Sequence, residues 1–175
     1  MIQREAVLAS QGMATRVKRW HTWPMLSADT VGRHSCRAAL IYLELWNIPR
    51  AEVLVWLLRH DLGELTAGDT PSYAKQQWQP LKDALDEVEI MGRATQSAGL
   101  PLLCGDEPLK CKIADALETW ETALFETKMG NQYAECAMVL MSQSIRILID
   151  DSYCSNDEKY HLRTAVGLFM NEKQK

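Results

Sequence analysis

Apolar residues recur along most of this chain every three or four positions, with polar residues between them. This is the spacing of an amphipathic α-helix, and the alternating β-branched runs that would indicate strands are absent. The pattern predicts helices near 3–18, over 30–46, 49–65, 74–97, 106–129 and 132–149, and over 156–171. We therefore expect an all-α protein of about six to seven helices, folded as a single domain over residues 1–175.

Helix-capping and helix-breaking residues fix several of these limits. Asp29 or Thr30 can act as the N-cap of the second helix, and Asp106 as that of the helix from 106 to 129. The sequence Asn47-Ile48-Pro49 ends the second helix, and Pro49 suits the first position of the third. Gly, Pro, Thr and Asp residues make 66–71 a turn-forming loop.

Length and composition exclude several classes of protein. The chain has 175 residues, 47% of them hydrophobic, which suffices for the core of one globular domain. A net charge of -4 argues against a binder of nucleic-acid polymers. No apolar run of about 18 residues predicts a transmembrane helix. The first residues also lack the apolar centre of a signal peptide. We expect a cytoplasmic protein without a membrane partner.

The five cysteines are odd in number and form no C-x-x-C pair. A disulfide framework or a zinc-thiolate site is therefore not expected, and a reducing compartment fits. We expect all five to be small buried hydrophobic residues.

The candidate chemistry centres on the adjacent residues His60 and Asp61, which lie in an apolar stretch. An imidazole and a carboxylate buried there are costly unless a partner compensates them. One divalent metal ion could bind both, together with His34 upstream and Asp115 downstream. Two nitrogen and two oxygen ligands suit Zn²⁺, Co²⁺, Mn²⁺ or Ni²⁺. The alternative for each residue is an ordinary hydrogen-bonded position in the core.

Two further carboxylates belong to the same region of the sequence. Glu64 follows His60 by four residues and Asp61 by three, so a continuous helix would place the three side chains on adjoining parts of one face. Asp69 follows in the loop, where a turn-capping role is the alternative. We expect these residues to converge with the proposed metal ligands.

The order His34, His60-Asp61, Asp115 resembles the metal motif of the HD-domain phosphohydrolases. Four further elements resemble the 5′-deoxynucleotidase branch of that superfamily, and still more its compact phage relatives that hydrolyse dATP to deoxyadenosine and triphosphate. These elements are Arg19-Trp20, Gly68-Asp69-x-Pro71, Lys75 and Lys112. The resemblance covers about residues 15–120 and implies an HD-type helical bundle.

The resemblance also implies roles for individual residues. Glu64 would be the acid/base or water-orienting group, and Asp69 would fix the sugar 3′-hydroxyl or a metal-bound water. Trp20 would pack against the sugar or base and crowd a 2′-hydroxyl. The cationic residues that would neutralise phosphate charge are Arg19, Lys75 and Lys112, with Arg16 a weaker candidate. As solvated surface charges, the same residues would have no such role.

Several functional alternatives stay open at this point. The favoured reaction is dATP hydrolysis, the nearest alternative is a 5′-deoxynucleotidase acting on monophosphates, and a non-catalytic helical metal-binding module is the alternative of another class. The resemblance implies a small-molecule deoxynucleotide as ligand, a homo-oligomer, and host cytoplasm if the chain is phage-encoded. A second divalent ion with the substrate phosphates is left open. One departure from the family is Arg33, which stands where a Glu usually precedes the first metal histidine.

Overall fold

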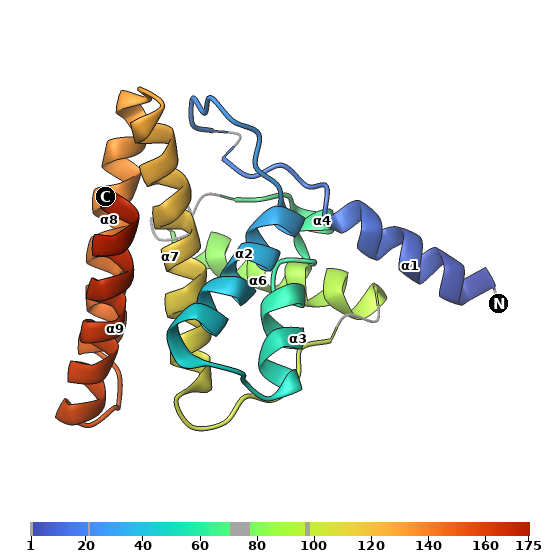
Figure 1. Ribbon diagram of the computed structural model, residues 1–175. Coiled ribbons are helices and arrows are strands. Elements are labelled where there is room, and N and C mark those ends of the chain that lie inside the picture. The colour runs from blue at the N-terminus through green and yellow to red at the C-terminus, as the bar shows by residue number, and fades with distance from the viewer. Residues whose placement is uncertain (1, 21, 71–77, 97–98) are drawn as a thin grey trace. The chain divides into compact units, whose positions relative to one another are not determined.

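Helices dominate the computed structural model, which describes residues 2–20, 22–70, 78–96 and 99–175 (Figure 1). This part of the chain holds seven helices of nine or more residues and one helix of four. Within the described residues the β-type pairing consists of an isolated bridge between Lys18 and Thr30, and no strand forms. The prediction of an all-α fold is confirmed.

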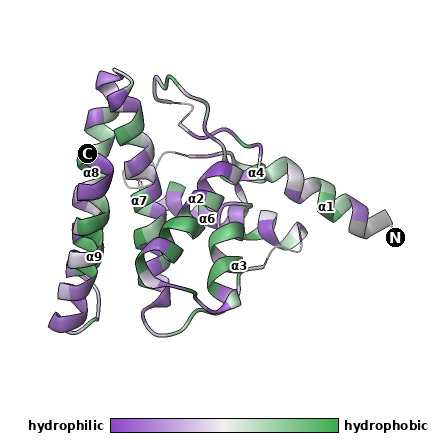
Figure 2. Ribbon diagram, viewed as in Figure 1, coloured by the Kyte–Doolittle hydropathy of each residue, from purple (hydrophilic) through white to green (hydrophobic). Residues whose placement is uncertain are grey.

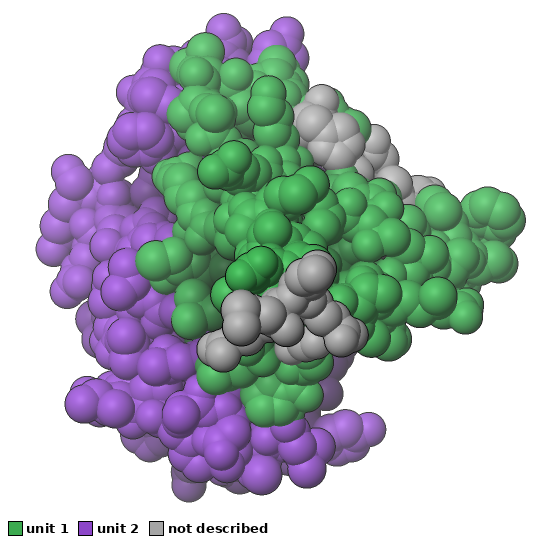
Figure 3. All heavy atoms as spheres, turned by 90° about the vertical axis from the view of Figure 1, so that its right-hand side faces the viewer, with its two compact units in different colours: residues 1–36, 55–101 green, residues 37–54, 102–175 purple. Residues whose placement is uncertain are grey.

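The chain divides into two compact units, which Figure 3 shows in different colours. The first comprises residues 1–36 and 55–101, and the second residues 37–54 and 102–175. Two of the three boundaries fall within helices, because α2 (Val31–Trp46) and α3 (Ala51–Arg59) each contribute residues to both units.

The first unit contains three further helices. They are α1 (Ile2–Ala14), α4 (Glu64–Ala67) and α6 (Gln79–Thr95). Helix α4 packs against both α1 and α6. Ala14 at the end of α1 and Leu62 before α4 are buried together, with Leu65 against them. This apolar contact fixes the start of α4, the helix that carries Glu64.

Helix α1 ends at Ala14 and a turn follows at Thr15 and Arg16, so the prediction of a helix to residue 18 is wrong. Val31 N–H donates to the Val17 carbonyl oxygen at 3.0 Å, and Arg19 N–H donates to the Asp29 carbonyl oxygen at 3.1 Å. These bonds run between antiparallel segments, and the helical pattern ends where they begin, after the last local bond from Val17 N–H to the Ala14 carbonyl oxygen. Pairing distant in sequence thus overrides local helix propensity.

The second unit is built on three long helices, which lie side by side in Figure 1. They are α7 (Glu107–Lys128), α8 (Gln132–Asp150) and α9 (Asn156–Gln174). Hydrophobic and hydrophilic residues mix along each of them in Figure 2, as expected of amphipathic helices. Their buried apolar side chains include Leu117, Trp120, Ala123, Ala137, Ile145, Ile149, Leu162, Val166 and Phe169.

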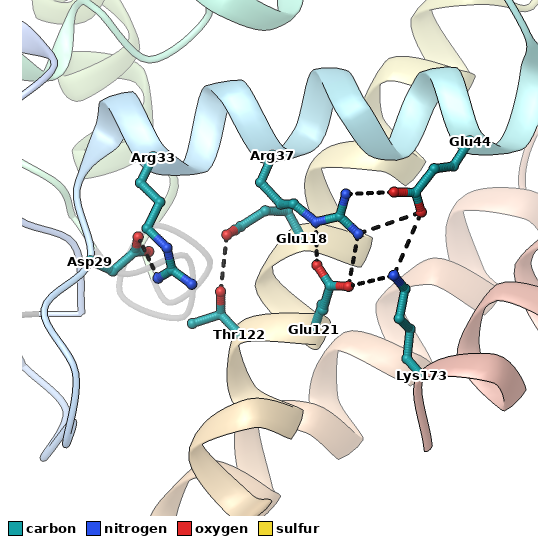
Figure 4. Close-up of polar contacts among 8 residues, drawn as sticks. All are labelled: Asp29, Arg33, Arg37, Glu44, Glu118, Glu121, Thr122 and Lys173. Carbon is teal, nitrogen blue, oxygen red and sulfur yellow. Dashed lines mark hydrogen bonds and ion pairs between the residues drawn. The ribbon is translucent and has the colours of Figure 1, made fainter. Parts of the chain in front are cut away.

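An ion-pair network in the second unit joins α2, α7 and α9 (Figure 4). The Arg37 guanidinium donates to Glu121 at 2.5 and 2.8 Å and to Glu44 at 2.8 Å. Lys173, near the end of α9, lies 3.2 Å from Glu121 and 3.7 Å from Glu44. Because two cations share two carboxylates, removal of one member leaves the others unbalanced.

Most predicted helix limits are confirmed, and those of α2, α7, α8 and α9 lie within three residues of expectation. Asp106 occupies the N-cap position of α7, but its side chain makes no capping bond and pairs with Lys110 at 2.8 Å. Part of the predicted helix 74–97 lies outside the described residues. None of the described helices is long and apolar enough to cross a membrane.

The five cysteines are free thiols, but the prediction that all are buried is wrong. Cys111 is buried in α7, whereas Cys36, Cys104 and Cys136 are exposed and Cys154 is half-buried. Helix periodicity does not distinguish these positions, because a cysteine suits an exposed or a buried helical face sterically.

Candidate metal centre

His34 lies in the first turn of α2 and is fully buried. The Thr30 hydroxyl accepts a hydrogen bond from the Arg33 N–H at 3.3 Å, so the predicted cap at Thr30 is confirmed. The chain before the helix approaches it closely at Gly32, where an added Cβ would lie 2.7 Å from the Thr15 Cβ. This close approach leaves no space for a side chain at Gly32 in the first turn of α2.

Helix α3 ends at Arg59, so the prediction of one helix over 49–65 is wrong. His60 to Gly63 form a turn, in which Leu62 N–H donates to the Arg59 carbonyl oxygen at 3.1 Å. Gly63 packs directly against the backbone of Glu89 in α6, which leaves no space for a side chain. The expected helical face shared by His60, Asp61 and Glu64 therefore does not exist, and tertiary packing sets their positions.

The His60 ring is held on two sides. Its Nδ1 lies 2.8 Å from the Leu57 carbonyl oxygen, a group freed by the end of α3. Trp56 stacks on the ring with centroids 5.1 Å apart and an interplanar angle of 7°. A proton on Nδ1 satisfies that carbonyl and makes Nε2 the electron-pair donor, which is the tautomer of a metal-binding histidine.

Two imidazoles and one carboxylate converge in the first unit. Asp61 Oδ1 lies 3.2 Å from His60 Nε2, and Asp61 Oδ2 lies 3.4 Å from His34 Nε2. Donor atoms of the three residues all lie within 4.8 Å of one another. Both histidines are buried and the carboxylate is 19% exposed, so the group is accessible on one side. This donor set fits a divalent transition-metal ion.

Asp115, the predicted fourth ligand, lies on α7 in the second unit, together with Lys112. Asp115 is half-buried and Lys112 is exposed. The structure brings together three of the four predicted ligands, and the roles of Asp115 and Lys112 stay predictions from the sequence.

The Glu64 carboxyl is buried at the start of α4. Burial raises its pKa to about 9, and the negative charges of Asp61 and Asp69 raise it further, while Arg19 opposes the shift. Glu64 therefore carries a proton at neutral pH in the metal-free protein. The charge of Asp61 acts on Glu64, and the catalytic role of Glu64 stays a prediction from the sequence.

Asp69 contacts Trp20, so the structure brings together two of the residues singled out in the sequence. The Trp20 N–H donates to Asp69 Oδ2 at 3.0 Å. Trp20 has a φ of 61°, a left-handed conformation that costs a bulky residue on the order of 1–3 kcal/mol. The Trp23 N–H, which donates to the Trp20 carbonyl oxygen at 2.8 Å, also holds this conformation. Such over-determined strain is typical of functional segments.

Asp29 has a role that sequence reasoning missed. Its buried carboxylate lies 3.8 Å from Arg19 and 3.2 Å from Arg33, so one anion holds two guanidinium groups. Arg33, the departure from the family pattern, thus pairs with the residue one turn before it in the chain. The signal in the sequence was a carboxylate four residues before Arg33.

Arg16 and Lys75 are the other two cationic residues predicted from the sequence. Arg16 is exposed in the turn that follows α1. Lys75 lies outside the described residues, as does Pro71 of the Gly-Asp-x-Pro element. The roles of Arg16 and Lys75 stay predictions.

A histidine from one helix and a His-Asp pair following the next, within an all-helical chain, are the features of the HD phosphohydrolase fold. The chain matches a solved structure described as cyanophage S-2L HD phosphohydrolase (DatZ) bound to dA and one catalytic Zn²⁺ ion, with a TM-score of 0.73. The match covers 94% of this chain and 96% of that chain at 17% identity, so the likeness is one of fold. The predicted HD fold is confirmed. Comparisons with protein-family models and with curated proteins give no match.

Proposed function

We propose that this protein is a metal-dependent phosphohydrolase of 2′-deoxynucleotides. The observation that carries the proposal is the convergence of His34, His60 and Asp61 beside the buried Glu64 carboxyl. The favoured reaction is dATP plus water to deoxyadenosine plus triphosphate. The dA and catalytic Zn²⁺ in the DatZ structure support an adenine deoxynucleoside and a metal, and the sequence resemblance supports the triphosphate.

The residues that would hold the metal are His34, His60 and Asp61, with Asp115 as the proposed fourth ligand. A divalent ion bound there supplies Lewis acidity, which lowers the pKa of water and stabilises charge on phosphoryl oxygens. Zn²⁺, Co²⁺, Mn²⁺ and Ni²⁺ all suit two imidazoles with carboxylates.

Glu64 would move the proton in this reaction. Hydrolysis forms a bond from the water oxygen to the α-phosphorus and breaks the bond to the 5′-oxygen, which must gain a proton. A cation near Glu64 lowers the pKa of its carboxyl from about 9 toward neutrality. A carboxyl whose pKa lies near the working pH exchanges protons most effectively.

Arg19, Trp20 and Asp69 would bind the nucleotide. Arg19 is 12% exposed and its charge acts on Glu64, which suits a role in neutralising the phosphoryl group. The strained Trp20 is fixed by Asp69, so its ring can form a rigid wall against the sugar. A wall at the 2′-carbon would exclude ribose sterically.

The single domain over residues 1–175 and the homo-oligomer also remain proposals. The match of 94% of the chain to one HD phosphohydrolase chain supports the single domain. Light scattering coupled to size-exclusion chromatography measures the oligomeric state.

Product analysis tests the proposed reaction. The purified protein, loaded with Zn²⁺ or Co²⁺, is incubated with each of the four dNTPs, ATP and dAMP. We expect deoxyadenosine and triphosphate from dATP, and a weaker preference for deoxyribose over ribose in Trp20→Ala. Phosphate release from dAMP alone would favour the 5′-deoxynucleotidase. Bound metal without hydrolysis of any substrate would favour a non-catalytic metal-binding module.

A further inference from the structure

The turn that carries the proposed metal ligands is seated on one face of α6. Glu89, Gly92, Arg93 and Gln96 recur at helical spacing, so their side chains share that face. Each of the four contacts the turn from His60 to Gly63, as described below. We refer to these four residues of α6 as the α6 contact face.

Two side chains of the α6 contact face bond to backbone carbonyls of the turn. Arg93 Nη1 donates to the His60 carbonyl oxygen at 2.9 Å, and Gln96 Nε2 donates to the Leu62 carbonyl oxygen at 2.8 Å. Helix α3 ends just before these residues, so their carbonyls lack the usual helical partners. Gln96 is buried and the Arg93 side chain is 14% exposed, which shields both bonds from competing water.

The other two residues bring the backbones together. Gly63 packs against the carbonyl of Glu89, and a Cβ on Gly92 would lie 2.9 Å from the Gly63 oxygen and 2.6 Å from Thr66 Oγ1. Close approach at two glycines fixes the distance between α6 and the turn. The two hydrogen bonds then fix the orientation of the turn relative to α6, because they end on the carbonyl oxygens of the residues before and after Asp61.

We propose that Arg93 is a positioning residue for the metal centre, with Gln96 in support. Arg93 donates to the carbonyl oxygen of His60, which belongs to the peptide group between His60 and Asp61. The hydrogen bond therefore orients the peptide group that joins the two proposed ligands. Loss of that bond lets His60 and Asp61 reorient, and the three donor atoms leave their common position. This inference rests on the proposed metal site and adds α6 to the elements that define it.

Co²⁺ titration of the metal-free full-length protein tests the proposal, by calorimetry and by the visible ligand-field spectrum. We expect Arg93→Met to weaken Co²⁺ binding about 10- to 100-fold, the range for loss of a group that orients a metal ligand. Its spectrum should change as the ligand geometry loosens. Arg93→Lys, which keeps a charged donor, should restore most of the affinity. Arg146→Met, at an exposed position of α8, is the matched control and should bind Co²⁺ with wild-type affinity.

The outcomes separate this inference from the proposed function. Unchanged Co²⁺ affinity and spectrum in Arg93→Met would overturn the positioning role alone. Loss of affinity that Arg93→Lys does not restore, with a parallel fall in thermal stability, would also overturn it. No Co²⁺ binding by wild type would overturn the metal site itself and this inference with it. Should Arg93→Met not fold, Gln96→Met undergoes the same comparison, with weaker binding expected.

Discussion

Asp69 accepts a hydrogen bond from the backbone N–H of Trp20 at 3.0 Å, and Trp20 has a left-handed φ of 61°. A loop carboxylate thus holds a tryptophan in a conformation that this residue type rarely adopts. Asp69→Ala should release the strain and let the Trp20 ring move. We expect kcat/KM for dATP to fall roughly 10- to 100-fold, with reduced discrimination against ATP.

Steady-state kinetics with dATP and ATP check this expectation for Asp69→Ala. Asp151→Ala, an exposed site at the end of α8, is the control and should retain wild-type values. Equal discrimination in Asp69→Ala and wild type would show that the contact has no part in sugar selection.

Metal content should depend on Asp61 and on the proposed fourth ligand, Asp115. Asp61→Ala removes the carboxylate that lies within 3.4 Å of both histidines, and we expect it to lose bound metal and activity. Asp115→Ala tests the ligand predicted from sequence and should also lose metal. Elemental analysis after dialysis measures both, with Asp83→Ala on the exposed surface of α6 as control. Full metal occupancy in Asp115→Ala would remove that residue from the ligand set.

Glu64→Gln should separate chemistry from metal binding. Glutamine keeps the size of the buried side chain but cannot exchange a proton at the reacting oxygen. We expect normal Zn²⁺ content and a kcat for dATP lower by roughly 10²–10⁴. Glu87→Gln, at an exposed position of α6, provides the matched control. Undiminished turnover in Glu64→Gln would exclude this carboxyl from the mechanism.

The same substitution should stabilise the metal-free protein at alkaline pH. Burial raises the pKa of Glu64 to about 9, so the folded state retains a proton that the unfolded state releases above about 4.5. The free energy of unfolding of wild type therefore falls as pH rises from about 4.5 to 9, and glutamine removes this loss. We expect Glu64→Gln to be more stable than wild type at pH 8.5, with a difference that grows by about 1.4 kcal/mol for each pH unit across this range.

Urea unfolding in EDTA at pH 5 and pH 8.5 measures this difference. The two proteins should differ little in stability at pH 5, which lies close to the unfolded-state pKa of about 4.5, where the loss of stability has only begun. A stability difference that shrinks as pH rises would contradict the assigned shift in the pKa of Glu64.

Glu121 should give the opposite pH dependence. Burial alone would raise its pKa, but hydrogen bonds from Arg37 and Lys173 outweigh it and lower the pKa below the usual value (Figure 4). Its contribution is therefore present above about pH 4.5 and lost as pH falls further. Glu121→Gln should cost about 1.5–3 kcal/mol at pH 7.

That cost should diminish as pH falls below about 4.5, because protonation of Glu121 in wild type removes the charge that the network stabilises. Glu172→Gln, exposed near the end of α9, is the control and should change stability little. A cost for Glu121→Gln that is constant between pH 7 and pH 3 would show that ionisation of Glu121 does not stabilise the network.

Local signals predicted the long helices well and the turn between His60 and Gly63 badly. The periodicity and caps of α2, α7, α8 and α9 act within a few residues, and their limits agree with the structure. Helix α3 ends early because α6 packs against Gly63, a contact distant in sequence. No pattern within 49–65 carries that information.

The candidate site shows the same division. Residue chemistry and spacing predicted that His34, His60 and Asp61 meet. The supporting residues were invisible to that reasoning, because Trp56, Arg93 and Asp29 act through stacking, a backbone carbonyl and a shared anion. Such contacts follow from the packing of segments and have no fixed spacing in the sequence.

The glycines at 63 and 92 carry no reactive group, yet their substitution should resemble the loss of a ligand. A methyl group at either position would push α6 away from the turn. A saturation screen that scores deoxynucleotide hydrolysis should therefore find both positions as intolerant as His60. Substitutions that aim to change the ligand can therefore be made at Trp20 and its neighbours. Positions 63 and 92 must stay glycine, because only a hydrogen atom fits where another residue would place its Cβ.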